Sequence, residues 1–434
     1  PPPPSPRRQR QMCIRDRFMK IAIIGSGISG LTCAYMLNRK HDITIFEKND
    51  YIGGHTHTHE IEHNGIKWNV DSGFIVYNER TYPNFINILD RLGVERQLTR
   101  MGFSVKSEKN DLEYAGHSLN GLFAQRSNLV RPSFIRMLRS MWRFNSEARA
   151  DLKELDSDTT LGEYLKLNNY PEEFIQHFII PIGAAIWSTV PHQMMNMPAI
   201  FFIRFFDNHG LLQIVDRPNW WVITGGSKRY VEKMVDGFEN KIRLSSPVKN
   251  VKREDGSITV QFGANSLDSE NFDSVIFATH SNQSLAMLDA PTKEEIEILS
   301  AIKYQKNDAL LHYDDSILPK RKNAWSSWNY LLDEDQSKAV ALTYNMNILQ
   351  SLKSDRTFCV SLNSGSLVDE SKVIKELSYD HPLFTTSSIN AQSRKHEISG
   401  KHNTYYCGAY WRNGFHEDGV MSALDVCKDF GESL

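Results

Sequence analysis

The sequence predicts an α/β fold in which a Rossmann-type nucleotide-binding domain is assembled from separated segments. Near the N-terminus a glycine-rich turn lies between an apolar run and a helical stretch, which is the arrangement of a βαβ unit. Short apolar runs typical of strands return after residue 241 and again near the C-terminus. The chain has no internal repeat and no Gly/Ser-rich linker. We therefore expect interleaved segments, not domains arranged in series.

The first three elements form the nucleotide-binding unit. Residues 20–24 (KIAII) are typical of a buried parallel strand, residues 31–38 continue as a helix, and residues 43–47 (ITIFE) predict a second strand. The turn after the first strand reads Gly25-Ser26-Gly27-Ile28-Ser29-Gly30. Its position between a strand and a helix makes this otherwise weak pattern informative.

Each glycine of this turn has its own role. Gly25 allows a tight turn, Gly27 lets the backbone approach a diphosphate, and Gly30 allows close packing of helix on strand. The start of the helix, with Ser29, supplies N–H groups and partial positive charge. Glu47, twenty residues beyond Gly27, ends the second strand. A carboxylate there accepts hydrogen bonds from an unphosphorylated ribose, as in FAD or NAD.

The later elements alternate between helical and strand patterns. Residues 81–214 have longer helical periods and more aromatic side chains, which predicts a helical insertion with helices near residues 82–92, 134–144 and 194–206. A Gly-Gly turn opens a helix within residues 220–238. Strands are expected from residue 241 with an Asp255-Gly256 hairpin turn, then at 273–279, 309–313, 339–344, 357–362 and 405–410, before a closing helix at 419–430.

The composition excludes several classes of protein. The 434 residues are 40% hydrophobic and 24% charged with a formal net charge of −2, which excludes wholesale disorder, collagen and coiled coil. A near-neutral chain lacks the basic footprint of a nucleic-acid binder. Five irregularly spaced cysteines predict no disulfide scaffold and a reducing, cytoplasmic setting. Residues 1–18, rich in proline and arginine, have no signal-peptide pattern, and we expect a non-native head before Met19.

One long uncharged stretch runs from Phe174 to Ile203. Its thirty residues are enough to span a membrane. Pro181, Pro191 and Pro198 interrupt it, and a lipid-exposed helix would lose backbone hydrogen bonds at each of them. We expect a buried, broken helical region that lines an apolar cavity.

Motifs at both ends of the chain carry a family resemblance. Glu47 to His55, which includes Gly53-Gly54, and then Val70-Asp71-Ser72-Gly73 resemble the extended dinucleotide motif of the flavin amine oxidase superfamily, which includes protoporphyrinogen oxidases and phytoene desaturases. These motifs are especially similar to those of a bacterial group of predicted NAD/FAD-binding amine-oxidase-like proteins. The supporting motifs are Pro247-Val248-Lys249-Asn250-Val251, Ala185-Ile186-Trp187-Ser188, Trp325-Ser326-Ser327-Trp328-Asn329-Tyr330, Cys407-Gly408-Ala409-Tyr410 and Gly414-Phe415-His416-Glu417-Asp418-Gly419.

The resemblance implies FAD as the cofactor and a discontinuous FAD-binding domain. That domain would comprise residues 19–80, 220–285 and 400–434, and residues 81–219 and 286–399 would form an inserted α+β substrate domain. The implied cofactor-binding residues are Gly25, Gly27, Ser29, Gly30, Glu47, Gly53, Gly54, His55, Val248, Gly408 and Gly419. Many members have arginine where this chain has His55, so a fixed cation is replaced by a group that titrates near neutrality.

Four residues near the C-terminal motif are the candidates for contact with substrate. Tyr410 and Trp411 follow the strand expected to end at the flavin, and Phe415 and His416 precede the helix expected to underlie it. Aromatic walls there would exclude water and orient a substrate carbon. A flavin accepts hydride directly from a C–H bond, so the sequence leaves open whether a positioned base is used.

Two other patterns, one of histidines and one of arginines, each allow more than one interpretation. His55, His57, His59 and His63 alternate as on one strand face, but no cysteine or carboxylate pair completes a metal site, and we expect no metal. Residues 131–149 alternate arginines with apolar side chains. This pattern fits either a helix packed on the core with a solvated basic face or peripheral contact with the inner membrane surface.

Three functions agree with these observations. The first is an FAD-dependent oxidoreductase that abstracts hydride from an apolar substrate, which the resemblance and the uncharged stretch indicate to be a lipid or fatty-acyl chain. The second is a flavin amine oxidase acting on a small amine. The third is a non-redox flavoprotein, such as an isomerase.

Overall fold

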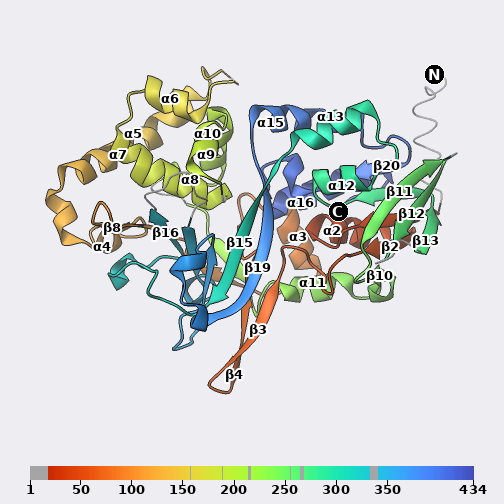
Figure 1. Ribbon diagram of the computed structural model, residues 1–434, viewed down its shortest axis with the longest axis horizontal. Helices are drawn as coiled ribbons and strands as arrows, with labels where there is room; N and C mark the ends of the chain where they lie inside the picture. The colour runs from red at the N-terminus through yellow and green to blue at the C-terminus, as the bar shows by residue number, and fades with distance from the viewer. Residues whose placement is uncertain are drawn as a thin grey trace.

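The computed structural model describes residues 18–156, 158–187, 189–213, 217–254, 256–263, 268–332 and 341–434. Figure 1 shows a largely helical lobe at one end and a lobe built on a parallel sheet at the other. Two long strands, β15 (Tyr304–His312) and β19 (Val373–Pro382), run between the lobes. Residues 1–17 of the expected non-native head lie outside the described residues.

The central sheet confirms the predicted Rossmann-type architecture. Its five strands are all parallel, in the order β10 (Ile242–Arg243), β2 (Asp42–Phe46), β1 (Lys20–Ile24), β14 (Ser274–Phe277) and β20 (Thr404–Tyr406). These strands come from three stretches of sequence separated by more than 100 residues each. The sheet is therefore discontinuous, as the sequence predicted.

Side chains of β1 alternate between the two faces of this sheet. Ile21 and Ile23 enter one core cluster, whereas Ala22 and Ile24 enter another. The first face is covered by α2 (Ile28–Leu37), α3 (Pro83–Arg91), α11 (Lys228–Val235) and α16 (His416–Asp429). The second face is covered by the antiparallel strands β11 (Val248–Glu254), β12 (Ser257–Phe262) and β13 (Asp268–Phe272) and the helices α12 (Ser281–Met287), α13 (Lys293–Ala301) and α15 (Thr386–Ser393).

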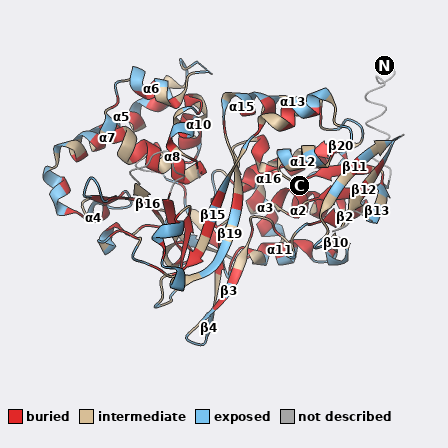
Figure 2. Cartoon of the chain, viewed as in Figure 1, coloured by how far each residue is buried: buried red, intermediate tan, exposed pale blue. Residues whose placement is uncertain are grey.

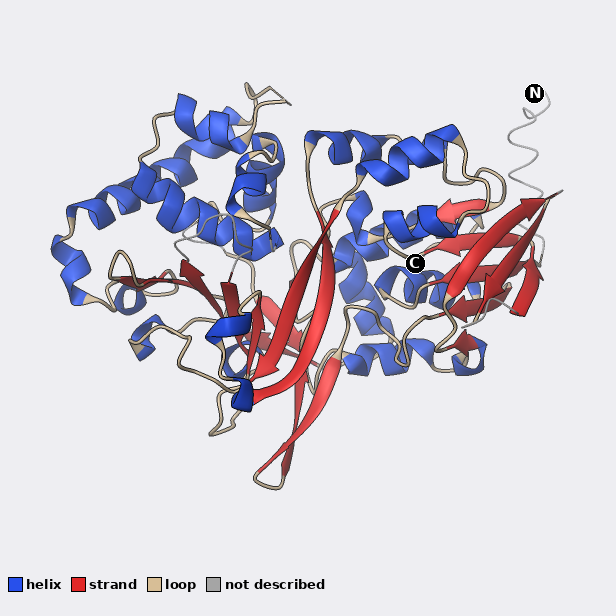
Figure 3. Cartoon of the chain, in the orientation of Figure 1, coloured by secondary structure: helices blue, strands red, loops and turns tan. Residues whose placement is uncertain are grey.

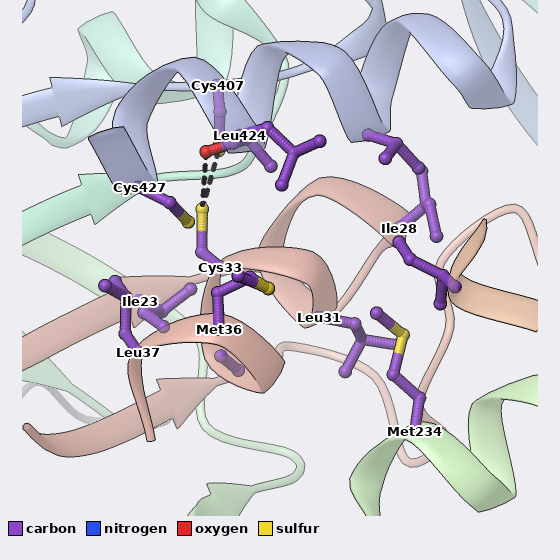
Figure 4. Packing of buried hydrophobic residues seen from close by; sticks show 14 of the residues in the cluster. Ile23, Ile28, Leu31, Cys33, Met36, Leu37, Met234, Cys407, Leu424 and Cys427 are labelled. Atoms are coloured by element: carbon purple, nitrogen blue, oxygen red, sulfur yellow. Dashed lines mark hydrogen bonds between the residues drawn. The ribbon is translucent and has the colours of Figure 1, made fainter. Parts of the chain in front are cut away.

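Helices α2 and α16 pack closely on the first face. Figure 4 shows Ile28, Leu31 and Cys33 of α2 beside Leu424 and Cys427 of α16. Cys33 Sγ lies 3.9 Å from Cys407 Sγ, and all three of these cysteines are buried. The two helices are thus held side by side, with their N-termini at the same edge of the sheet.

A second, mixed sheet forms the floor of the other lobe. Its order is β19, β15, β18 (Cys359–Leu362), β17 (Ala341–Asn345), β16 (Trp328–Leu332), β7 (Phe103–Ser107) and β8 (Leu112–Ala115). Only the β16–β7 pair is parallel among these neighbours. A two-stranded sheet pairs β3 (Thr58–His63) with β4 (Ile66–Asp71). A three-stranded sheet has the order β5 (Val76–Asn78), β9 (Trp220–Ile223) and β6 (Arg96–Thr99). The short helix α14 (Met346–Leu349) follows β17.

Helices cover the far side of the mixed sheet, as Figure 3 shows. They are α4 (Leu119–Leu122), α5 (Pro132–Asp151), α6 (Leu161–Leu167), α7 (Glu172–Phe174), α8 (Ile180–Trp187), α9 (Pro191–Met195) and α10 (Ala199–Asn208). The uncharged stretch is therefore broken, with Pro191 and Pro198 at the starts of α9 and α10. None of the helices in the described ranges has the length and apolar character needed to span a bilayer.

Pro181 is accommodated inside this helical region. A wide π-helical turn (Ile175–Ile179) precedes it. Proline has no N–H to donate to a carbonyl of the preceding turn. Tyr114 OH donates to the carbonyl of His177, in this turn, at 2.6 Å. The mixed sheet thus supplies a donor to the backbone just before the proline.

The prediction for residues 81–214 was wrong in one respect. Three strands, β6, β7 and β8, lie inside the expected helical insertion. Each has only four or five residues, and β8 is buried on both faces, so neither length nor alternation marked them as strands. The small sheet of β5, β9 and β6 also crosses the expected boundaries at residues 80 and 219. Those boundaries stay predictions.

Candidate functional site

The glycine-rich turn is closed by backbone contacts. Gly25 has φ of +102°, and a Cβ there would lie 2.7 Å from the carbonyl oxygen of Ala278 at the end of β14. A Cβ on Gly30 would lie 1.9 Å from the carbonyl oxygen of Gly25. These two glycines therefore let α2 and β14 approach the turn.

Gly27 differs from its neighbours because space is open beside it. A Cβ at Gly27 would meet nothing within 4 Å, and its backbone is extended (φ −68°, ψ 178°). It precedes α2 without a capping side chain, so the first N–H groups of the helix face this space without an intrahelical acceptor. Backbone of Gly53 bridges to Gly27, and a Cβ on Gly54 would lie 3.2 Å from Gly27 Cα. The open space, the free N–H groups and the helix dipole fit a dinucleotide diphosphate.

Glu47 lies beside this turn. Its Oε2 accepts hydrogen bonds from Ser26 N (3.0 Å) and Ser26 Oγ (2.7 Å), and its Oε1 accepts from Asn49 N (2.9 Å). Each carboxylate oxygen can accept about two hydrogen bonds, so Oε1 keeps capacity for a ribose hydroxyl. The segment leading to Val248 runs alongside, because Ser246 N donates to Glu47 O at 2.8 Å. Glu47 and Val248, 201 residues apart, therefore share one end of the crevice.

Ser29 and Gly419 join the two helices. Ser29 Oγ donates to the carbonyl oxygen of Gly419 at 3.0 Å, and a Cβ on Gly419 would lie 2.8 Å from Ile28 Cγ2. Ser29 and Gly419 thus hold α2 against α16, and the N-termini of the two helices lie close together. Gly408 is buried, and a Cβ there would lie 2.4 Å from Cε1 of the Tyr410 ring.

Imidazole rings from three distant segments converge next to Gly54. The ring centroid of His55 lies 6.0 Å from that of His280 and 5.8 Å from that of His381. His280 follows β14, at the carboxyl edge of the parallel sheet, and His381 ends β19. Open α/β sheets bind ligands at this edge. The sequence prediction included His55 and missed the other two, because nothing in the local pattern indicates that a strand end 225 residues away reaches Gly54.

Burial and mutual repulsion keep these imidazoles neutral. Burial, with a smaller contribution from the neighbouring His55, lowers the pKa of His280 and of His381 to about 3. Burial also lowers the pKa of His55, opposed by the carboxylate of Asp380 and reinforced by Lys48. Nδ1 of His280 is buried with no hydrogen-bond partner among the described residues. Asn307 Nδ2 lies 2.9 Å from His381 Nδ1 and can donate to it.

His416 and Phe415 lie at the start of α16, where the lobes meet. The His416 ring stacks on Phe74 with centroids 3.6 Å apart, and its Nε2 lies 2.7 Å from Tyr230 OH. Burial holds the pKa of His416 well below its usual value. Phe415 faces the helical lobe, with its ring stacked 4.9 Å from that of Phe205 in α10.

Tyr410 and Trp411 lie in a different environment from Phe415 and His416. The predicted strand at 405–410 ends at Tyr406, and a 3₁₀ turn (Ala409–Trp411) follows. This turn directs both side chains into the core on the second face of the sheet, where Tyr410 lies 5.1 Å from Trp411 and 6.3 Å from Tyr304 between ring centroids. The four predicted residues are thus divided between two places.

An aromatic junction connects Phe415 with the uncharged stretch. We define the junction by Phe201, Phe205, His209, Phe384 and Phe415. Phe201 stacks on Phe384 at 4.9 Å, and His209 stacks on Phe205 at 3.8 Å. Burial lowers the pKa of His209 to about 4, so its ring is neutral at pH 7. The junction therefore presents apolar, uncharged rings beside the start of α16.

The histidines weighed as metal ligands have other contacts. His57 stacks on Tyr51 at 4.1 Å, His59 Nε2 lies 2.8 Å from Ser72 Oγ, and His63 Nε2 lies 3.0 Å from Asp355 Oδ1. Among the described residues, no group of three or more His, Cys, Asp or Glu side chains is arranged to hold a metal ion.

Other motifs of the resemblance have structural positions. Asp71 accepts hydrogen bonds from Ser227 N at 3.0 Å, which ties the hairpin β3–β4 to the start of α11. Trp187 packs on Phe205 at 4.8 Å, while Ser188 lies outside the described residues. Trp328 to Tyr330 belong to β16 in the mixed sheet.

Comparisons with known proteins agree with this geometry. In sequence, the chain is 24% identical over 174 residues to protoporphyrinogen oxidase 2 of Arabidopsis thaliana, covering 37% of this chain and 31% of the relative. It is 39% identical over 74 residues to 1-hydroxycarotenoid 3,4-desaturase of Flavobacterium sp., covering 17% of this chain and 14% of the relative. These matches span less than a third of the relatives' length.

Solved structures match over nearly the whole fold. A CLA-producing fatty acid isomerase from P. acnes superposes with a TM-score of 0.69 at 16% identity, covering 95% of this chain and 98% of that one. Cyclohexylamine oxidase from Brevibacterium oxydans superposes with a TM-score of 0.66 at 14% identity, covering 96% and 100%. At these identities the likeness establishes the fold.

The model of the family described as flavin containing amine oxidoreductase matches residues 28–316, about two thirds of the chain. The match includes Gly30, Glu47, the Gly53-Gly54 pair and the end of β14. It agrees with the resemblance seen in the sequence and confirms the predicted oxidoreductase class and flavin cofactor. The chain belongs to the flavin-containing amine oxidoreductase family.

Proposed function

We propose that FAD lies along the crevice at the carboxyl edge of the parallel sheet. Gly27, the N–H groups that open α2, and Gly53-Gly54 hold its diphosphate, Glu47 accepts from its ribose, and Val248 lies at the adenine. His55 and Gly408 lie further along the same crevice. Bound FAD supplies an acceptor for hydride.

We propose further that the substrate is an apolar chain, of the lipid or fatty-acyl class. The aromatic junction carries this proposal, because it joins thirty uncharged residues to the start of α16. Its rings exclude water and orient a C–H bond without offering a charge to a polar substrate. A fatty acid isomerase among the matching folds and a carotenoid desaturase among the relatives support an apolar substrate.

A desaturation removes a hydride and a proton from adjacent carbons. The proton needs an acceptor, and the neutral imidazole of His55 is the candidate, since its lowered pKa keeps a free nitrogen lone pair at pH 7. Phe415 and Phe205 hold the chain, and His416 is held in place by Phe74 and Tyr230. We assign Phe415 to contact with substrate and His416 to the wall of the crevice.

The test uses the chain from Met19 loaded with FAD. Anaerobic flavin bleaching is followed with a phospholipid extract, free fatty acids, small amines and NADH in turn, and products are analysed by mass spectrometry. We expect bleaching by a lipid fraction and a product two mass units lighter. Bleaching by amines alone would favour an amine oxidase, and a rearranged lipid of unchanged mass would favour an isomerase. A folded protein that takes up no FAD would contradict the site itself.

A further inference from the structure

Exposed apolar side chains gather at the outer end of the helical lobe. Val130 is 84% exposed, Leu119 77% and Leu129 54%. They lie in α4 and in the 3₁₀ turn (Arg126–Val130) before α5, at the left extreme of Figure 1. Arg126 links the two segments, because its guanidinium donates to Asn120 Oδ1 and to the carbonyl of Phe123. We call residues 119–139 the tip. A clustered apolar surface of this kind marks an interaction site.

A groove of about 470 Å³ lies in the tip. Its apolar lining comes from Leu129, Val130, Pro132 and Ile135, and Arg136 and Arg139 provide its charged side. Apolar side chains next to guanidinium groups match the two parts of a phospholipid, the acyl chain and the phosphate.

The segment of sequence that forms the groove carries charge of one sign. Between Tyr114 and Ser146 the sequence contains five arginines and no lysine, aspartate or glutamate, although the whole chain has a net charge of −2. Arg131 donates to the carbonyls of Asp111 and Asn110, contacts that leave its charge formally uncompensated. Arg136 pairs with Glu173, whereas Arg139 is exposed and forms no ion pair with the residues that the structure describes. An anionic partner is therefore favoured.

The orientation of α5 locates the contact. Phe134, Met137 and Phe144 face inward and are buried, so the apolar stripe of residues 131–149 is already covered by the lobe. The membrane contact expected for residues 131–149 can therefore involve only the first turns of α5 and the segment before it. Figure 2 shows this end of the lobe with exposed residues outermost. The helix supports the tip and does not lie flat on a surface.

We propose that the tip docks on a membrane surface that contains anionic lipid. Leu129 and Val130 insert among the acyl chains, and Arg126, Arg131 and Arg139 lie at the level of the phosphates. The docking would hold the helical lobe, and with it the aromatic junction, next to the bilayer. The inference does not depend on which substrate reacts.

Vesicle flotation of the FAD-loaded protein tests the proposal. We expect binding to vesicles of phosphatidylcholine and phosphatidylglycerol at 7:3, weak binding to pure phosphatidylcholine, and a decline as NaCl rises from 0.1 to 0.5 M. Val130→Asp should reduce binding roughly tenfold, and Arg139→Glu by a similar factor, at about 1 kcal/mol per basic residue near a charged surface. Flavin absorbance and melting temperature report that each variant is folded and loaded.

Matched variants elsewhere provide the control. Ile66→Asp changes a 54% exposed apolar residue in the β3–β4 hairpin, and Arg39→Glu reverses an exposed arginine after α2. Both should bind vesicles like the unchanged protein. The proposal is overturned if the protein ignores anionic vesicles, if Val130→Asp binds normally, or if the controls lose binding equally. Sedimentation that shows a dimer disrupted by Val130→Asp would assign the tip to a second copy and also overturn it.

Discussion

The crevice beside α2 and the helical lobe are held together in opposite ways. In the crevice, backbone meets backbone, and glycines such as Gly25 and Gly30 leave no room for a Cβ. In the lobe, large rings such as Phe202 and Phe206 pack on one another with centroids 4.2 Å apart. In the crevice, adding a single carbon atom should therefore cause a large loss of stability or of FAD binding. In the lobe, the loss of stability should instead grow with the side-chain volume removed.

The largest effect is expected from Gly30→Ala. A Cβ there would lie 1.9 Å from the carbonyl oxygen of Gly25, and neither backbone can move without separating α2 from β1. We expect destabilisation of more than about 4 kcal/mol and little soluble protein. Soluble yield and thermal melting measure it. Normal folding of this variant would show that the crevice can relax like a side-chain core.

Gly27→Val should separate binding from folding. A Cβ at Gly27 meets nothing within 4 Å and the backbone is extended, so the fold should tolerate valine. The side chain would occupy the space proposed for the diphosphate. Loss of two charge-assisted hydrogen bonds at roughly 1.5–3 kcal/mol each predicts at least about 100-fold weaker FAD binding. Flavin fluorescence titration measures it.

Gly365→Val is the matched control for this experiment. Gly365 is exposed, has open space for a Cβ, and lies outside the crevice. It should keep both stability and FAD affinity. Equal affinity of the Gly27→Val and Gly365→Val proteins for FAD would place the diphosphate elsewhere.

Phe202→Ala tests the lobe. Phe202 is fully buried and contacts Phe206, Trp187 and Phe144. Removing the ring should cost about 3–5 kcal/mol of unfolding free energy in the lobe, through lost burial and a cavity. Denaturant unfolding measures this loss. Trp142→Ala is the control, because Trp142 is 66% exposed and its removal should change the stability by less than about 0.5 kcal/mol. A small loss for Phe202→Ala would mean that the lobe collapses around the cavity.

The pH dependence of FAD binding is the finest test of the crevice. His280 and His381, with pKa values of about 3, are neutral between pH 5 and 8, and burial lowers the pKa of His55 as well. An anionic diphosphate nearby raises their pKa, so binding takes up protons. The affinity is greatest below the pKa of the free protein and is lost as pH rises through the pKa of the complex. For each proton taken up, the affinity for FAD changes by at most about tenfold per pH unit. Calorimetry in buffers of different ionisation heat counts the protons.

His55→Arg should reduce this proton uptake, because a guanidinium is already charged. His41→Gln is the control, since His41 is also buried with a lowered pKa but accepts from Met19 N at the opposite edge of the sheet. It should leave proton uptake unchanged. Binding without proton uptake in the unchanged protein would show that the diphosphate lies away from the imidazoles.

Local patterns in the sequence predicted the nucleotide-binding unit well. Strand, turn and helix follow one another within residues 20–37, and the burial of β1 and the positions of Gly25 and Gly30 depend on neighbours in the sequence and on one partner strand. The helices near 82–92 and 134–144 were also found, because each has a long periodic apolar face. The strands β6 to β8 were missed because they are short. In addition, β6 and β7 pair with strands that are distant in the sequence, and β8 pairs with β7.

The sequence by itself determined the Rossmann-type sheet, because glycine spacing and apolar periodicity act over a few residues. Its motifs also carried the resemblance that implied the family and the flavin cofactor. Only the tertiary structure decided what surrounds that unit. It brought His280 and His381 to His55, placed Phe415 against Phe205, and turned Tyr410 and Trp411 into another core. These contacts join residues more than 100 positions apart, and the packing of whole strands and helices sets them, so no local pattern contains them.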